Sequence, residues 1–484
     1  MNQLENIVTY INDSLSGYVL VFLLVAAGLY FSIRTKFVQV RCFGEGFRAV
    51  FRKQGAKDGR GISSFQALTT AIAAQVGTGN IVGVCGAILV GGPGAIFWMW
   101  VIAFLGMATN YAEAVLAQKT RTVDENGEVC GGPVYYIKHA FKGKFGKFLA
   151  GFFAVAITIV CGFIGAMVQT NSITSSITGV FTAFGADVSD YTWVIGVLIA
   201  LLAAFIFLGG VKRIASVTEK MVPLMAVMYL IGGLLVLIIN IKNVPEAFSL
   251  IFRYAFVPQA LLGGGFGSAI AKAVQKGAQR GLFSNEAGMG TTPHAHAQAN
   301  VKTPHEQGVC AMIGVFIDTF VVLSISALVV LSTLYTGDGP LVGLVGTESQ
   351  SFSSLAESSA GLIDANMVQR AFQLSFTTLF GGNAAVGNVI GSIFVALCLF
   401  FFAFSTVISW NFFGRINFRY LFGQKATVIY SVIAIACIFA GSIFKNSLVW
   451  GLSDLFNNLM VIPNVIALFA LGGLVVSLTS FQKK

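Results

Sequence analysis

Residues Thr69 to Ala87 read TTAIAAQVGTGNIVGVCGA, an apolar stretch long enough to cross a bilayer, yet Gly77-Thr78-Gly79-Asn80 interrupts it at mid-depth. In hydrocarbon every backbone N–H and C=O needs a partner, so a glycine break at that depth is tolerated only inside protein or beside a polar cavity. Two half-helices that meet at a break offer N–H groups to an anion and bare carbonyls to a cation. The stretch therefore predicts a binding site inside the membrane.

The composition of the chain indicates a membrane protein throughout its length. Only 10% of the 484 residues are charged and the mean hydropathy is +0.81, whereas an average soluble domain has about 25% charged residues. At about 20 apolar residues per crossing, the sequence predicts an all-α polytopic protein with eleven transmembrane helices. The expected spans are Ser16–Ser32, Ile62–Leu89, Gly94–Ala117, Phe148–Ile173, Tyr191–Gly210, Val217–Ile241, Phe266–Ala299, Gly308–Tyr335, Ala384–Phe413, Ala426–Phe444 and Leu448–Leu478.

The net charge of +10 has a topological explanation, because the Lys and Arg residues gather in alternate loops. Segments 34–60, 119–147, 212–220 and 415–425 are basic, whereas the loops between them carry acidic residues such as Asp187, Asp190 and Asp338. Positively charged loops stay on the cytoplasmic side. We therefore expect the N-terminus outside and the C-terminus inside, with membrane lipid and not nucleic acid as the surrounding partner.

The spans divide into an extra N-terminal helix with a basic cytoplasmic segment (1–61) and two groups of five (62–242 and 243–484). Each group opens with a glycine-interrupted helix, at Gly77–Asn80 and at Gly281–Gly290. Because five is odd, the second group enters the membrane from the opposite side, which predicts an inverted repeat. The second group includes an external loop, 336–373, in which 357–372 is expected to form a short lid helix.

Polar side chains cluster at the first break. Gln75, Thr78 and Asn80 would add hydroxyl and amide oxygens to the free carbonyls, and such hard oxygen ligands suit a group I cation. Each unpaired buried polar group costs about 1–3 kcal/mol, so three of them indicate a wet or occupied site. The alternative is helix packing, in which small and polar residues join transmembrane helices.

The second break holds Phe283, Ser284, Asn285 and Glu286. An acidic residue within a membrane is a functional candidate, as a proton carrier, a cation ligand or a lock on the broken helix. A structural role is the favoured interpretation of Glu286, because its carboxylate could cap the N–H groups from Ala287 onward. Direct participation in coupling remains the second interpretation.

Further polar residues lie in the middle of the fourth and ninth spans, and they favour a cavity over isolated packing contacts. They are Gln169, Asn171 and Ser172 on the fourth span, and Ser405, Thr406, Ser409 and Trp410 on the ninth. Thr406 and Trp410 are four residues apart and share a helix face, so the hydroxyl could meet a ligand that the indole encloses.

Metal, nucleotide and enzyme sites are not supported by the sequence. His294 and His296 are two residues apart, so on a helix they point about 200° away from each other and cannot chelate one ion. The segment Gly77–Gly83 is one residue too long for a dinucleotide fingerprint, and no Walker A sequence is present. Four scattered histidines supply no catalytic base beside a nucleophile.

Three stretches resemble a known family. Gly91–Gly106, GGPGAIFWMWVIAFLG, is similar to the signature of the alanine or glycine:cation symporter family (sodium:alanine symporters), and QVGTGNIVG and GLFSNEAGMG resemble its other recurrent stretches. The resemblance implies two inverted five-helix repeats, as in leucine-type neurotransmitter:sodium symporters, plus one additional helix. It also implies sodium-coupled uptake of small neutral amino acids such as alanine or glycine across the inner membrane of a prokaryote, by alternating access.

The resemblance also implies roles for individual residues. The backbone around Gly77 and Gly79, with Thr78, would take the substrate carboxylate, and Trp410 would help to close the pocket. The expected substrate-binding residues are Gly77, Thr78, Gly79, Gln169, Phe283, Ser284, Asn285, Thr406 and Trp410. The expected sodium ligands are the carbonyls of Ala73 and Val76 with Ser405 or Thr406, and Gln75 and Asn80 would line a second cation position if one exists.

Two other functions remain open at this stage. A proton-coupled amino-acid permease of the same fold would use Glu286 as the proton carrier. A channel would need the same cavity without a closing step.

Overall fold

The computed structural model describes residues 7–8, 10–12, 14–51, 61–124, 127–256, 266–342, 364–444 and 447–479. These residues are almost entirely helical, as predicted, with one exception: a small antiparallel hairpin of β1 (Thr122–Val123) and β2 (Val129–Cys130). Within the described ranges, eight helices are long and apolar enough to cross a membrane. The other three expected spans are the first one and the two interrupted ones, so the total of eleven stays a prediction.

Helices occupy each predicted span, and segments 38–51, 133–140, 244–256 and 364–379 outside those spans also contain helices. In the first half they are α2 (Val21–Arg34), α3 (Val38–Arg41), α4 (Phe43–Phe51), α5 (Ser64–Gln75), α6 (Val82–Gly91), α7 (Ala95–Thr120), α8 (Pro133–Ala140), α9 (Gly143–Ile159), α10 (Gly165–Ala183), α11 (Thr192–Phe207) and α12 (Gly210–Ile239). In the second half they are α13 (Val244–Phe256), α14 (Phe266–Asn285), α15 (Pro293–Ala297), α16 (Pro304–Val315), α17 (Ser324–Leu334), α19 (Asp364–Leu379), α20 (Ala384–Phe422), α21 (Thr427–Ile443), α22 (Ser447–Ala470) and α23 (Gly472–Leu478).

The first interrupted helix is broken where the sequence predicts. Helix α5 begins at a capping box, in which Ser63 and Gln66 bond to each other's backbone N–H groups, and it ends at Gln75. Val76 and Gly77 leave the helical region of φ and ψ, with ψ of 83° and −151°. A single 3₁₀ turn, η2 (Thr78–Asn80), then leads into α6.

The second break is shorter than expected. Residues 281–285 belong to α14, and the chain leaves the helix only at Glu286. The prediction of a break from Gly281 is wrong because this glycine serves packing: a Cβ there would lie 3.4 Å from Cα of Met99 on α7, and small residues let membrane helices approach closely. Left-handed φ values at Glu286, Gly288 and Gly290 (56°, 87° and 83°) end the helix.

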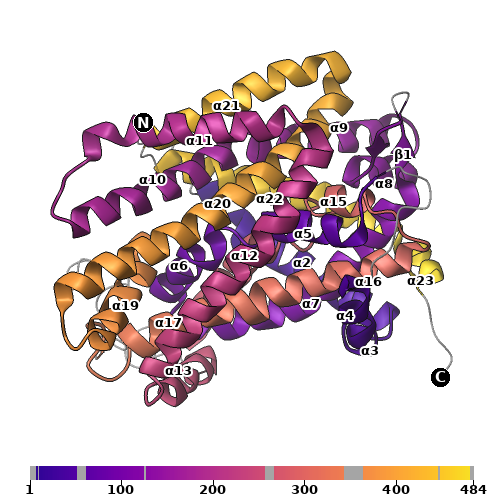
Figure 1. Ribbon diagram of the computed structural model, residues 1–484. Helices are drawn as coiled ribbons and strands as arrows, with labels where there is room; N and C mark the ends of the chain where they lie inside the picture. The colour runs from indigo at the N-terminus through magenta and orange to yellow at the C-terminus, as the bar shows by residue number, and fades with distance from the viewer. Residues whose placement is uncertain are drawn as a thin grey trace.

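Burial divides the helices into an inner and an outer set. Helix α7 and segment 304–334 are 72% buried over their most apolar windows, whereas α11, α12 and the helix that includes α21 are 33% buried. The outer helices expose large apolar side chains such as Leu201 and Phe205. Figure 1 shows α4, α8 and β1 at one end of the molecule and α13 and α19 at the other.

The expected lid helix in the external loop falls partly outside the described residues. The structure describes α19 from Asp364, so residues 357–363 of the predicted segment lie outside it. Helix α19 continues to Leu379 and packs against α20 and α17.

Candidate functional site

The two interrupted helices meet inside the protein. Gln75, at the end of α5, donates from Nε2 to the carbonyl of Asn285, at the end of α14, over 2.8 Å. Both residues are buried. The break in the first half and the break in the second half therefore face each other, as the sequence predicts.

Asp318 joins the two breaks through its carboxylate. This residue lies in a π-helical segment, η6 (Phe316–Leu323), between α16 and α17. Its Oδ1 accepts from Asn80 Nδ2 at 2.7 Å, and its Oδ2 accepts from Ser284 Oγ at 2.9 Å and from Thr319 Oγ1 at 2.7 Å. A buried charge needs such donors, and here the donors come from both breaks.

Glu286 contacts side chains and does not cap the following N–H groups. Its Oε1 accepts from the indole Nε1 of Trp410 at 2.6 Å, and its Oε2 accepts from Thr291 Oγ1 at 2.6 Å. The amides of Ala287 and Gly288 donate to other side chains instead. The predicted capping role of Glu286 is therefore wrong.

Two other residues cap the second break instead. The amide of Ala287 donates to Asn285 Oδ1 at 3.1 Å, and the amide of Gly288 donates to Glu113 Oε2 at 3.2 Å. Asn464 on α22 donates to Glu113 Oε1 at 2.6 Å and to the carbonyl of Gly288 at 2.9 Å. Helices α7 and α22 thus hold this turn in place.

A cavity of about 540 Å³ lies beside both breaks. Thr78 and Gly79 from the first break line it together with Phe283, which lies in the last turn of α14 just before the second break. Its other walls come from α10, α19 and α22. The lining residues are Thr78, Gly79, Val82, Gly83, Asn171, Ser172, Ser175, Ser176, Gly179, Arg280, Phe283, Asn366, Gln369, Leu399, Trp450 and Asp454.

Several lining residues were missed by the sequence analysis. Arg280 and Asp454 are charged residues within the seventh and eleventh predicted spans, and a charge inside a span is by default a functional candidate. That signal was available. Trp450, Asn366 and Gln369 carry no such signal, because their place beside the cavity depends on how α19 and α22 pack.

Buried polar atoms without a partner lie around the same breaks. Gln75 Oε1, Thr78 Oγ1, Gln169 Oε1 and Ser409 Oγ have no hydrogen-bond partner among the described residues. Such an atom costs about 1–3 kcal/mol unless something satisfies it. Of these four residues Thr78 lines the cavity, so its hydroxyl is available to a polar ligand there.

The expected sodium ligands come together from two helices. The carbonyl of Ala73 is 3.3 Å from Ser405 Oγ and 3.1 Å from Thr406 Oγ1. A Cβ on Gly77 would lie 2.4 Å from Thr406 Oγ1, so the main chain next to Val76 also touches this group. Carbonyl and hydroxyl oxygens suit a sodium ion, and three of the four expected residues bring such oxygens together, Ala73 on α5 with Ser405 and Thr406 on α20.

The side chain of Asn80, which was considered for a second cation position, already has partners. Its Oδ1 accepts from the amide of Gly77 at 3.1 Å, and its Nδ2 donates to Asp318. In contrast, Gln75 Oε1 remains unpartnered. A Cβ on Gly314 would come within 2.9 Å of this oxygen, so helix α16 covers it closely.

Trp410 lies beneath Phe283 and does not line the cavity. The two rings meet edge to face with centroids 6.3 Å apart, and Trp410 is 2% exposed. A Cβ on Gly165 would lie 2.3 Å from the indole ring. Phe283 therefore separates the cavity from Trp410, and Ser284 and Asn285 face Asp318 and Thr319 instead of the cavity.

His294 and His296 have separate surroundings. The His294 ring is stacked between Phe153 and Phe413, and its Nδ1 donates to the carbonyl of Thr291 at 2.8 Å. His296 Nδ1 is 2.8 Å from Gln307 Nε2. The two rings thus contact different partners.

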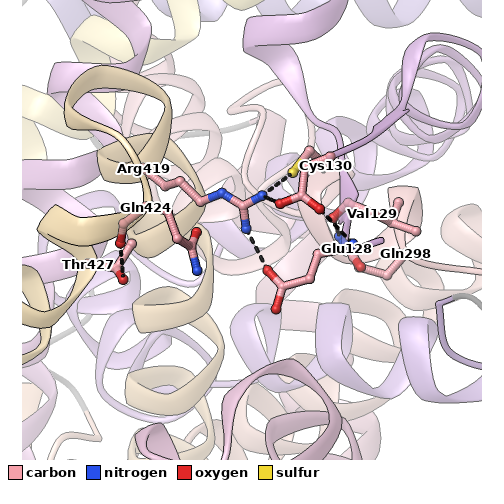
Figure 2. Close-up of polar contacts among 8 residues, drawn as sticks. Glu128, Val129, Cys130, Gln298, Arg419, Gln424 and Thr427 are labelled. Atoms are coloured by element: carbon pink, nitrogen blue, oxygen red, sulfur yellow. Dashed lines mark hydrogen bonds and ion pairs between the residues drawn. The ribbon is translucent and has the colours of Figure 1, made fainter. Parts of the chain in front are cut away.

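An ionic cluster joins the β1–β2 hairpin to α20, as Figure 2 shows. Arg419, near the end of α20, forms ion pairs with Asp124 and with Glu128 Oε2, the latter at 2.5 Å, and its Nη2 is 3.1 Å from Cys130 Sγ. Gln298 donates to the carbonyl of Val129 at 2.9 Å. The β1–β2 hairpin is therefore tied to α20 and to the residue that follows α15.

The comparisons with known proteins agree over the whole chain. The model of the sodium:alanine symporter family matches residues 1–484. The sodium/alanine symporter AgcS of Methanococcus maripaludis is 39% identical over 476 residues, which cover 98% of this chain and 96% of that protein. The putative sodium/proton-dependent alanine carrier protein YrbD of Bacillus subtilis is 38% identical, with 97% and 90% covered.

The name of a third relative refers to a different substrate. The probable sodium/glutamine symporter GlnT of Bacillus subtilis is 35% identical over 474 residues, which cover 98% of this chain and 89% of that protein. The relatives thus share an architecture across almost their entire lengths. The chain belongs to the sodium:alanine symporter family and is a multi-pass membrane transporter, not an enzyme.

Proposed function

We propose that this protein couples the inward movement of sodium to the uptake of a small neutral amino acid such as alanine or glycine. The observation that carries the proposal is the meeting of the two interrupted helices beside a 540 Å³ cavity. Main-chain dipoles at such breaks bind a zwitterion and a cation together. Membership of the sodium:alanine symporter family supports the same function.

The substrate carboxylate would bind at the first break. The amide of Gly77 is already bonded to Asn80 Oδ1, so the next N–H groups, those of Thr78 and Gly79, are the donors nearest the cavity. They begin a helical turn, where the dipole favours an anion. The substrate ammonium would turn toward Gln169 Oε1, an unpartnered acceptor, and Phe283 would limit the size of the side chain.

The sodium ion would bind between α5 and α20. Its ligands would be the carbonyls of Ala73 and Val76 and the hydroxyl oxygens of Ser405 and Thr406. Since the first interrupted helix also binds the substrate, an ion that links it to α20 would order the substrate site. Inward sodium flow supplies about 2.3 kcal/mol per charge for each 100 mV of membrane potential.

Alternating access requires one end to close while the other opens. In this proposal the cavity, which α19 lines, would open at the α19 end, and the Arg419 cluster would close the opposite end. The basic segments around α3, α4 and α8 lie at the closed end, which supports an outside N-terminus and a cytoplasmic closed end. In this assignment the structure has its cavity open to the outside.

Packing between the halves supports two inverted five-helix repeats, 62–242 and 243–484. Helix α10 packs against α20, α11 against α21, and α7 against α16. These are the helices at equivalent positions of the two groups. Counterparts that contact each other are expected when a pseudo-twofold axis passes between them.

Radiolabelled uptake into proteoliposomes tests the proposal. Alanine or glycine uptake should need external sodium and fail with potassium, and glutamine should compete poorly. Replacement Thr406→Val removes one proposed ligand and should raise the sodium concentration for half-maximal uptake about tenfold or more, since 1.4 kcal/mol is a factor of ten. Thr378→Val, at an exposed position on α19, is the control. An unchanged sodium requirement in Thr406→Val contradicts the ligand assignment.

Proton coupling through Glu286 is the second candidate, because a fully buried carboxylate lies at the second break. Both of its oxygens accept hydrogen bonds, from Trp410 and Thr291, which favours a fixed acceptor over a proton carrier. Uptake without sodium that collapses with a protonophore, and that Glu286→Gln abolishes, would establish the proton-coupled function instead.

A further inference from the structure

A cluster of three side chains far from the transport cavity has the composition of a transition-metal site. Cys42 lies between α3 and α4, Glu45 lies in the first turn of α4, and His305 lies in the first turn of α16. One ligand atom of each residue lies within 4.8 Å of those of the other two. Among the described residues, this is the single group of three or more His, Cys, Asp or Glu side chains that meets in this way.

The cluster is closed on one side and open on the other. Cys42 and His305 are each 4% exposed, whereas the side chain of Glu45 is 34% exposed. Helix α4 is pressed against α16, since a Cβ on Gly46 would lie 2.7 Å from the carbonyl of Val309. An ion could therefore enter past Glu45 and be held between two firmly packed elements.

Hydrogen bonds behind His305 determine which ring nitrogen carries the proton. Thr479 Oγ1 donates to the carbonyl of Val475 at 2.9 Å, and the hydroxyl of Tyr111 donates to Thr479 Oγ1 at 3.1 Å. The hydroxyl proton of Tyr111 is therefore engaged in the hydrogen bond to Thr479. The Tyr111 oxygen accepts from His305 Nδ1, 2.7 Å away. Nε2 of the neutral ring therefore has a free lone pair.

That nitrogen faces the other two residues. His305 Nε2 is buried, lies 3.4 Å from Glu45 Oε1, and has no hydrogen bond of acceptable geometry among the described residues. Histidines that bind metals are oriented in this way, with the second ring nitrogen donating to a neighbouring acceptor.

Two charged residues beside the cluster, Arg41 and Glu306, also contact the backbone. Arg41 donates to the carbonyl of Thr35 at 3.3 Å. The carboxylate of Glu306 accepts from the amide of Lys302 at 3.2 Å.

We propose that Cys42, Glu45 and His305 bind one Zn²⁺ ion, with water as the fourth ligand. Thiolate, imidazole and carboxylate are the ligands that zinc prefers, in tetrahedral geometry. Burial raises the pKa of the Cys42 thiol, so the ion displaces the thiol proton, which leaves to solvent. The bound ion ties the segment before α4 to α16.

Metal titration of the purified, chelator-treated full-length protein tests this proposal without any transport assay. Cobalt(II) should bind one ion per chain and give a thiolate-to-metal charge-transfer absorption, which zinc then removes by displacement. One proton should be released for each ion bound. Absence of saturable binding would overturn the proposal, and so would binding without the thiolate absorption.

Substitution of each proposed ligand tests whether that residue binds the ion. Cys42→Ser should abolish the charge-transfer absorption, and Glu45→Gln and His305→Ala should weaken zinc binding about tenfold or more. The matched controls Cys130→Ser, Glu246→Gln and His139→Ala lie outside the cluster and should bind as the unmodified chain does. If His305→Ala does not fold, Glu45→Gln decides, because its side chain is partly exposed. Unchanged zinc affinity in Glu45→Gln and an unchanged absorption in Cys42→Ser would each refute the site.

Discussion

The side chain of Asn80 donates a 2.7 Å hydrogen bond to Oδ1 of Asp318, and Oδ2 of the same carboxylate accepts from Ser284. One buried acid thus connects the 3₁₀ turn of the first interrupted helix to the last turn of α14. A substrate that contacts both breaks needs them at a fixed distance from each other. Asp318, which lies in η6, holds the two breaks in that arrangement.

Replacement Asp318→Asn should therefore impair transport. An amide keeps one acceptor oxygen and replaces the other with an NH2 group, which then faces either Asn80 or the hydroxyls of Ser284 and Thr319. Donors on that side lose their acceptor, at about 1–3 kcal/mol each. We expect a large fall in the rate of alanine uptake and a lower melting temperature. The exposed Asp338→Asn is the matched control. Normal uptake in Asp318→Asn would show that the arrangement of the two breaks does not depend on this carboxylate.

Replacement Gly77→Ala tests the contact between the first break and α20. The φ of Gly77 is −128°, so its backbone accepts any residue, and the cost is steric: a Cβ would lie 2.4 Å from Thr406 Oγ1. The hydroxyl must move, and we expect a higher sodium requirement for uptake. Gly473→Ala, with no atom within 4 Å of the added Cβ, should behave normally. Equal sodium curves for both variants would argue against a cation site here.

Replacement Trp410→Phe isolates the hydrogen bond to Glu286. The smaller ring keeps an aromatic contact with Phe283 but leaves Glu286 Oε1 without its 2.6 Å donor. Hydrogen bonds to charged groups contribute about 1.5–3 kcal/mol, so the thermal stability and the maximal uptake rate should both fall.

Gly165, which packs against the ring of Trp410, offers an independent test of the position of this ring. Gly165→Ala should displace the indole, because the added Cβ would lie 2.3 Å from it, whereas Gly151→Ala meets nothing within 4 Å. If the two alanine variants transport equally well, the position of Trp410 is not critical.

Replacement Arg419→Gln should loosen the closed end. It removes both ion pairs to the hairpin and the contact with Cys130 Sγ. In a protein in which Cys130 is the single cysteine, a maleimide should then react with this thiol several times faster. Lys425→Gln, an exposed change just beyond α20, is the control. Identical labelling rates in the two variants would mean that the ionic cluster does not restrain this end.

The sequence by itself determined the class of protein, the positions of its helices and the first break. These features are local: an apolar run of sufficient length crosses the bilayer, and glycines beside polar residues inside such a run interrupt it. The local sequence led to the wrong prediction at Gly281. A glycine that ends a helix cannot be distinguished by sequence from a glycine that allows another helix, here α7, to pack closely.

Tertiary structure alone decided which polar groups meet. Asn80 and Asp318 are 238 positions apart, and Trp410 and Glu286 are 124 apart, so their pairing depends on which helices become neighbours. The same holds for Arg280 and Asp454 beside the cavity, and for Cys42 and His305 at the opposite end. A buried polar side chain forms its hydrogen bond with whichever group the packing brings within about 3 Å. The periodicity of the sequence does not indicate which group that is.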